Sequence, residues 1–162
     1  PNSLNDFWTA PKQIGANLTS AAADDARGNC GTNCTGYDTC FLVNRAQNGP
    51  DDWRDKPVAT LASAFSGISV DVYTDQDAFQ VYSCNSQNGS LTLKDTQGLH
   101  NVTGRPRVVE QYGCVVMEVE DWIDAINQPE WQRSKKQIFG PGDGPYVLQA
   151  VYNFSVNANP SS

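Results

Sequence analysis

Three polar side chains lie within or beside stretches that alternate like β-strands, and these are the residues that could do chemistry. In the stretch 112–120, alternation places Glu118 on one strand face, with apolar residues on either side of it along the chain. Loss of water around such a carboxyl raises its pKa toward neutrality, which suits a general base. A strand-end glutamate that faces solvent or forms a salt bridge is the alternative.

The other two candidates are an amide and a second carboxylate. Gln80 shares one face of an expected strand with Tyr82 and Cys84. An amide within such a face needs hydrogen-bond partners, which the hydroxyls of a sugar could supply. Asp38 lies just before another strand, where its carboxylate could accept hydrogen bonds from two ligand hydroxyls. An exposed amide and an ordinary turn residue are the alternatives.

Metal and cofactor chemistry has no recognisable motif in the sequence. His100 is the only histidine, and it lies in a polar loop beside Asn101, where a solvated side chain is expected. The spacing Cys30-x3-Cys34-x5-Cys40 lacks the paired short spacings of a zinc ribbon. No phosphate-binding glycine loop or Gly-x-Ser-x-Gly motif occurs. We therefore expect no metal and no cofactor.

The charge balance argues against two classes of partner. The 162 residues include 11 Lys and Arg against 18 Asp and Glu, a net charge of −7, without a basic cluster. Nucleic acids and anionic membrane surfaces are therefore unsuitable partners, and a neutral ligand is easier to accommodate. No apolar run approaches the roughly 18 residues of a membrane helix. The chain begins at Pro1 without a signal-peptide pattern, so we expect a mature, processed polypeptide.

Sequons and cysteines both indicate an oxidising compartment. Five Asn-x-Ser/Thr sequons occur where chance would supply roughly one or two. Their asparagines are Asn17, Asn33, Asn88, Asn101 and Asn153, and the five cysteines are Cys30, Cys34, Cys40, Cys84 and Cys114. We expect a secreted, extracellular glycoprotein with a disulfide among the first three cysteines and one thiol left unpaired. Accidental sequons and buried thiols are the alternative.

Hydrophobic periodicity predicts an antiparallel all-β protein with one domain over residues 1–162. The expected strands are 39–43, 58–62, 69–73, 79–84, 90–94, 111–119 and 146–156. Residues 121–137 contain Pro129, which disfavours a long helix, so we expect an irregular excursion there. Phe7 and Trp8 have no preceding element to cover them. Either they fold back or a partner covers them.

Five segments match, in order, the motifs of a known enzyme family. Asp6–Gly15 is similar to Asp-Phe-x-x-Pro-x-x-Ile-Gly, and Gly36–Phe41 is similar to Gly-Tyr-Asp-His-x-Phe. Val72–Thr74 and Phe79–Asn85 are similar to Val-x-Thr and Gln-Phe-Tyr-Thr-Gly-Asn. The most specific match sets Glu118–Pro129 against Glu-Thr-Gln-Asn-x-Pro-Asp-Ala-x-Asn-x-Pro. The chain thus resembles the aldose 1-epimerases, the galactose mutarotase family, especially its secreted fungal members.

The resemblance implies a fold, a reaction and residue roles. The family fold is a large antiparallel β-sandwich, the mutarotase supersandwich, and this chain would form its C-terminal half. Glu118 matches the catalytic glutamate that takes the proton from the C1 hydroxyl, and Asp38 and Gln80 match sugar-binding positions. The reaction interconverts the α and β anomers of a hexose such as glucose or galactose by ring opening and reclosure, without a cofactor.

The sequence differs from the family pattern at several positions. The family's acid histidine lies in the N-terminal half, and His100 does not align with it. The substitutions are Thr39 for histidine, Val119-Glu120 for Thr-Gln, Cys84 for glycine and Ile123 for proline. We therefore expect an N-terminal polypeptide of the same precursor as a partner, with a disulfide as one means of attachment. A non-catalytic, secreted carbohydrate-binding protein of the same fold is the alternative.

Overall fold

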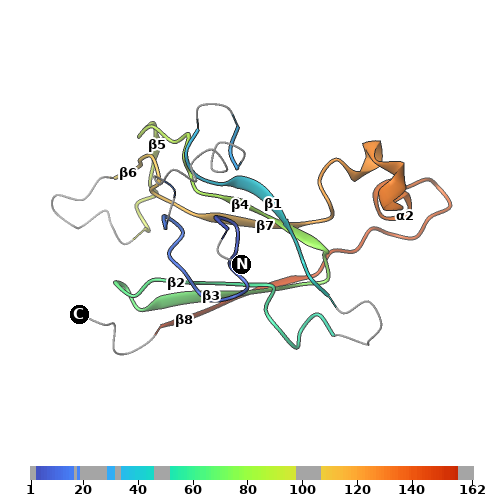
Figure 1. The fold of residues 1–162 in the computed structure, drawn as a ribbon, viewed down its shortest axis with the longest axis horizontal. Helices are drawn as coiled ribbons and strands as arrows, with labels where there is room; N and C mark the ends of the chain where they lie inside the picture. The colour runs from blue at the N-terminus through green and yellow to red at the C-terminus, as the bar shows by residue number, and fades with distance from the viewer. Residues whose placement is uncertain are drawn as a thin grey trace. The chain divides into compact units, whose positions relative to one another are not determined.

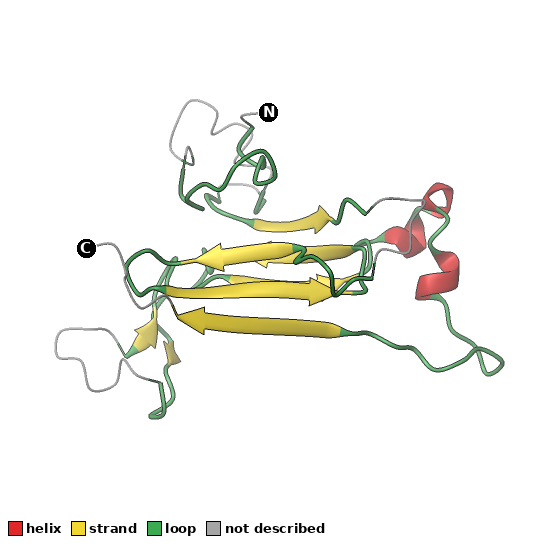
Figure 2. Cartoon of the chain, turned by 90° about the horizontal axis from the view of Figure 1, so that it is seen from below, coloured by secondary structure: helices red, strands yellow, loops and turns green. Residues whose placement is uncertain are grey.

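The protein is almost entirely strands and turns in the computed structural model, which describes residues 3–16, 18, 29–31, 34–45, 52–97 and 107–156. Its strands there are β1 (Asp38–Leu42), β2 (Ala59–Ala62), β3 (Ile68–Thr74), β4 (Ala78–Tyr82), β5 (Leu91–Thr92), β6 (Val108–Val109), β7 (Val116–Glu120) and β8 (Ala150–Val156). The helical segments are short, as Figure 2 shows: η2 (Ala125–Asn127), η3 (Pro129–Trp131) and α2 (Ser134–Gln137). The predicted all-β class is confirmed.

The strands form three sheets whose order does not follow the sequence. The orders are β1-β4-β7, β2-β3-β8 and β5-β6. β1 and β4 pair antiparallel. Ser83 N–H donates to the Tyr37 carbonyl oxygen at one end of the pair, and Val43 N–H donates to the Asp77 carbonyl oxygen at the other. The pairings of β3 with β2 and β8, and of β5 with β6, are also antiparallel (Figure 1). The chain therefore brings distant segments together within one sheet.

By their internal contacts the residues fall into two compact units, which are described separately. The first comprises residues 1–39 and 80–118, and the second comprises 40–79 and 119–162. Packing of the sheets into one sandwich domain, which the resemblance implies, stays a prediction. No helix in the described ranges is long and apolar enough to cross a membrane.

The first unit is organised around the buried ring of Tyr37. This side chain is completely buried, and its hydroxyl donates to the Leu4 carbonyl oxygen at 3.1 Å. Phe7 packs edge-on against it with ring centres 5.6 Å apart, and the Lys12 ammonium lies 4.5 Å from the centre of the Phe7 ring. Phe7 thus folds back, which is one of the two expected outcomes. Trp8 remains 75% exposed.

Disulfides join Cys30 to Cys34 and Cys84 to Cys114. The expected link among the first three cysteines is confirmed, and Cys40 is the free thiol of the chain. The second bridge closes 30 residues of sequence, so it restricts the unfolded chain more than the first, which closes only four.

Charged groups fix the excursion that follows β7 in the second unit. Arg133 donates to Asp77 at 2.6 Å and also to Asp121, and its guanidinium lies 5.0 Å from the Trp122 ring centre. Gln137 donates to Asp121 at 3.1 Å and to the Trp122 carbonyl oxygen at 2.8 Å. The predicted irregular excursion is confirmed, and side-chain hydrogen bonds take the place of a regular helix.

Local backbone geometry shifts several expected strand boundaries. β4 ends at Tyr82 rather than 84, because Cys84 adopts a left-handed φ of 51° and leaves the strand. β7 begins at Val116 rather than 111, because Tyr112 has a φ of 60° and Gly113 N–H bonds back to the Glu110 carbonyl oxygen. Cys84 therefore does not continue the face that carries Gln80 and Tyr82. β6 was not expected at all.

Candidate functional site

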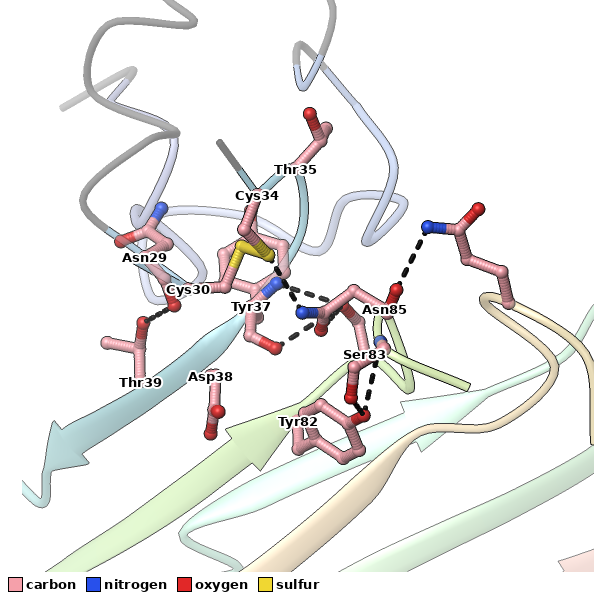
Figure 3. The surroundings of a disulfide bond; sticks show 12 residues. Asn29, Cys30, Cys34, Thr35, Tyr37, Asp38, Thr39, Tyr82, Ser83 and Asn85 are labelled. Atoms are coloured by element: carbon pink, nitrogen blue, oxygen red, sulfur yellow. Dashed lines mark hydrogen bonds between the residues drawn. A yellow bond between two sulfur atoms is a disulfide. The ribbon is translucent and has the colours of Figure 1, made fainter. Parts of the chain in front are cut away.

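Asp38 is the first residue of β1, and the carbonyl oxygen of Asn29 fixes its backbone by hydrogen bonds. Its N–H donates to the Asn29 carbonyl oxygen at 2.5 Å, and the Thr39 hydroxyl donates to the same oxygen at 2.6 Å (Figure 3). Because neighbouring residues on a strand face opposite sides, Thr39 faces away from the side of Asp38. The position where the family usually has histidine is therefore not on the face of the candidate site.

The turn that leads into β1 requires glycine. Gly36 has a φ of +132°, and a Cβ at this position would lie 2.5 Å from the Ser83 hydroxyl oxygen. That oxygen accepts a hydrogen bond at 2.8 Å from the buried N–H of Tyr37. Asn85 donates its amide to Cys34 Sγ at 2.9 Å, which ties the same turn to the first disulfide (Figure 3). The position of Asp38 therefore depends on a tightly packed turn.

Asp38 and Gln80 are brought together from adjacent strands. Gln80 Nε2 donates to Asp38 Oδ1 at 2.6 Å, so the carboxylate is one of the partners that the amide requires. The Gln80 Oε1 atom is enclosed and has no hydrogen-bond partner within the described ranges. Asp38 itself is exposed. The pair thus offers an open carboxylate, whereas the amide oxygen becomes available only if the Gln80 side chain moves.

Tyr82 lies next to this pair. Hydrogen bonding with Ser86 lowers the pKa of the Tyr82 phenol, whereas burial and the nearby charge of Asp38 act in the opposite direction. In Figure 3 the side chains of Asp38 and Tyr82 extend to the same side of their two strands. Tyr82 is therefore a neighbour of the site that the sequence placed beside Gln80 but did not assign to it.

Glu118 lies in the middle of β7, the third strand of the sheet that holds the other two candidates. Asp38 is in β1 and Gln80 is in β4, which lies between β1 and β7. The three predicted residues therefore come from three strands of one sheet.

The surroundings of Glu118 differ from the expectation. Its side chain is exposed, so the apolar enclosure that its sequence neighbours suggested is absent from the described ranges. Desolvation is instead found at Cys40 in β1, where burial raises the thiol pKa to about 11 and the Glu120 carboxylate acts in the same direction. The sequence assigned no role to Cys40 or Glu120, although each lies two residues from a candidate.

The described ranges hold no cluster of three His, Cys, Asp or Glu side chains that could bind a metal ion. Asn88 and Asn153 are exposed. The predicted residues Asn17, Asn33, His100 and Asn101 lie outside the described ranges.

A shallow hollow occurs in the second unit, and none of the three predicted residues lines it. It encloses about 300 Å³ and is lined mainly by Asp75, Asp121, Lys135, Phe139 and Tyr146. Asp121 is already hydrogen-bonded to Arg133, and the phenol of Tyr146 is hydrogen-bonded to Gln76. We assign the hollow no role in catalysis.

The fold and these residues define an all-β protein with a polar sheet face, suited to hydrogen bonding with hydroxyl groups. The chain is 41% identical over 167 aligned residues to a probable aldose 1-epimerase of Arthroderma benhamiae, covering 96% of this chain and 36% of the relative. It is 37% identical to the epimerase FSL3 of Gibberella zeae, covering 94% of this chain and 34% of the relative. The chain belongs to the aldose 1-epimerase family.

A bacterial relative matches a shorter part of the chain. An aldose 1-epimerase of Haemophilus influenzae is 31% identical over 97 residues, covering 60% of this chain and 23% of that protein. No protein-family model matches the chain, and no solved structure matches it significantly. The chain spans about a third of the length of the two fungal relatives.

Proposed function

We propose that this chain is part of an aldose 1-epimerase that interconverts the α and β anomers of a hexose such as glucose or galactose. The observation that carries the proposal is the direct contact between Asp38 and Gln80, on a sheet that also holds Glu118 in β7. The names of the relatives support the same reaction. A face of carboxylates and an amide suits a sugar, since each group can accept hydrogen bonds from hydroxyls.

Glu118 acts as the general base in this proposal. Its carboxylate takes the proton of the C1 hydroxyl while the bond between C1 and the ring oxygen breaks and a C1 aldehyde forms. Rotation about the C1–C2 bond presents the other aldehyde face to the C5 hydroxyl, and reclosure gives the other anomer. Glu118 then returns the proton to the new C1 hydroxyl oxygen. Because Glu118 is exposed in this chain, its desolvation would come from the bound sugar and the rest of the enzyme.

Asp38 and Gln80 orient the sugar. The Asp38 carboxylate retains acceptor capacity beyond its bond from Gln80, so it can receive sugar hydroxyls. The hydrogen bond at 2.6 Å also restricts the Gln80 rotamer, which reduces the entropy lost when a ligand is held. These two residues position the reacting carbon rather than exchange protons with it.

The general acid comes from outside this chain. Ring opening also needs a proton donor at the ring oxygen, and the resemblance assigns that role to a histidine in the N-terminal half of the family. About two thirds of each fungal relative lies beyond the matched region. We propose that an N-terminal polypeptide of the same precursor completes the site, and that the active form contains both parts.

Replacing Glu118 with glutamine tests the proposal. In the complete enzyme, Glu118→Gln should slow mutarotation of freshly dissolved α-glucose or α-galactose by roughly 100- to 10,000-fold in polarimetry, because the proton acceptor is removed while the shape is kept. Sugar affinity by calorimetry should change little. The matched control is Glu130→Gln, another exposed glutamate, which should leave both unchanged. Sugar binding without any acceleration by the wild type would instead favour the non-catalytic carbohydrate-binding protein.

The compartment is part of the same proposal. We propose a secreted, extracellular glycoprotein, supported by two disulfides and by the exposure of the sequon residues Asn88 and Asn153. Enzymatic removal of N-linked glycans should lower the intact mass and convert the modified asparagines to aspartate. Peptide mapping that finds every sequon asparagine unmodified in protein from its native source would contradict it.

A further inference from the structure

The β2-β3-β8 sheet has two chemically different faces. Side chains of directly opposed residues share a face, and the register pairs Leu61 with Val70 and Val70 with Phe154. The apolar face carries Ala59, Leu61, Ile68, Val70, Val72, Ala150, Tyr152, Phe154 and Val156, with Thr74 at its end. The opposite face is mainly polar and carries Thr60, Ser69, Asp71, Asn153 and Ser155, together with Ala62, Tyr73 and Val151. Hydrogen bonds of 2.6 Å between Thr60 and Asp71 and 2.7 Å between Ser69 and Ser155 link side chains across the polar face.

Cover over the apolar face decreases from β3 to β8. Val72 is completely buried and Val70 is 9% exposed, so the centre of β3 faces the interior of the second unit. Phe154, which pairs with Val70, is 69% exposed on β8. At the end of the strands Ile68 is 48% exposed and its partner Val156 is 72% exposed. The apolar face is therefore left uncovered along β8.

β8 is also an unprotected edge of the sheet. The strand order places β3 on one side of it and leaves its other edge without a partner among the described strands. All seven residues of Ala150–Val156 are exposed, and the sequence Ala-Val-Tyr-Asn-Phe-Ser-Val holds no charge and no proline. Soluble proteins protect long edge strands with charges, proline, bulges or a covering segment. β8 has neither charges nor proline, so we expect a covering segment to protect its edge.

We infer that the free edge and apolar face of β8 are where the remaining part of the epimerase docks. The occupant is a polypeptide segment that adds a strand along β8 and places apolar side chains over Phe154 and Val156. About two thirds of each fungal relative lies outside the region that this chain matches, which is enough to supply such a segment. The sequon at Asn153 agrees with this, because Asn153 lies on the polar face, and a glycan there leaves the apolar face clear.

This inference rests on the proposed need for the rest of the enzyme, but not on its catalytic chemistry. The test is photo-crosslinking in the complete enzyme with Phe154→benzoylphenylalanine, and the matched control is Ser155→benzoylphenylalanine, the next residue on the opposite face. The Phe154 probe should crosslink to peptides outside residues 1–162, and the Ser155 probe should give at least tenfold less of that product. Circular dichroism checks that both variants fold like the wild type.

Three results would overturn the inference. They are crosslinks only between two copies of residues 1–162, identified by mixing isotope-labelled and unlabelled protein; equal crosslinking from both positions; and no crosslink from either. Polarimetry on the unmodified enzyme separates this inference from the proposed function. A Phe154 crosslink in a protein that does not accelerate mutarotation would support the docking surface and refute the catalytic proposal.

Discussion

Replacing Arg133 with methionine should destabilise the protein by about 2 kcal/mol at pH 7. Methionine keeps an unbranched apolar chain but removes the charge that neutralises Asp77 and Asp121. The Arg133 side chain is 15% exposed, and those of Asp121 and Asp77 are 14% and 24% exposed. An exposed ion pair contributes about 0.2–1 kcal/mol. Loss of one partner of a fully buried pair costs about 3–5 kcal/mol.

The expected loss of stability lies between the values for exposed and buried pairs, because both carboxylates keep other partners. Asp77 keeps Lys136, and Asp121 keeps a hydrogen bond from Gln137 at 3.1 Å, so neither carboxylate is left without a partner. At about 2–4 °C per kcal/mol for a chain of this size, the unfolding temperature should fall by about 4–8 °C in calorimetry. The matched control is Arg54→Met, whose guanidinium is 57% exposed, and it should change the free energy of unfolding by less than about 0.5 kcal/mol.

The effect of Arg133→Met should also depend on pH. Burial raises the pKa of Asp121, but hydrogen bonds from Arg133, the Trp122 backbone and Gln137, with the Arg133 charge, lower it below the ordinary 3.8. The unfolded carboxyl, with its higher pKa, takes up a proton first as the pH falls. The stabilisation is therefore complete above the ordinary pKa and is lost as the pH falls through the folded value. A stability difference below about 0.5 kcal/mol at pH 7, or one equally large at pH 3, would refute this reasoning.

The remaining predictions concern the cysteines and the turn before β1. Replacing both Cys84 and Cys114 with alanine should destabilise the protein by about 3–4 kcal/mol in urea unfolding, since their bridge closes a 30-residue segment; a change below about 1 kcal/mol would contradict this. Cys40, with a pKa of about 11, should react with iodoacetamide at pH 8 about 100-fold more slowly than a thiol of pKa 9, and an equal rate would show that it is not desolvated. Gly36→Ala should weaken sugar binding and lower the unfolding temperature, because its Cβ would displace the Ser83 hydroxyl; unchanged affinity would separate this turn from the site.

Strand alternation accounts for the part of the fold that the sequence could predict. All seven expected strands overlap observed ones, and five match within two residues at both ends, because each combines alternating or apolar residues with flanking turn residues. β6 has only two residues, Val108–Val109, which is too short to show a period. The end of β4 was missed because the left-handed backbone at Cys84 depends on its disulfide and turn contacts, which periodicity does not report.

For the candidate site, the sequence predicted the residues but not how they are arranged. The types of Asp38, Gln80 and Glu118 suggested their chemistry, and the family resemblance supplied their roles. Their presence in one sheet depends on strand order, which places β4 between strands that are distant in the sequence. The hydrogen bond between Asp38 and Gln80 joins residues 42 positions apart, so no local pattern could predict it. The exposure of Glu118 was also unpredictable, since it depends on what covers the sheet.

The most direct test of the central claim is exchange NMR of the anomeric protons of equilibrated galactose with a catalytic amount of the complete enzyme. The α and β anomers give separate C1 proton signals, so magnetisation transfer between them measures the interconversion rate itself. The proposed function predicts exchange far above the uncatalysed rate with the wild type and its loss with Glu118→Gln. Exchange that stays at the uncatalysed rate with the wild type for both galactose and glucose, or that survives in Glu118→Gln, would contradict it.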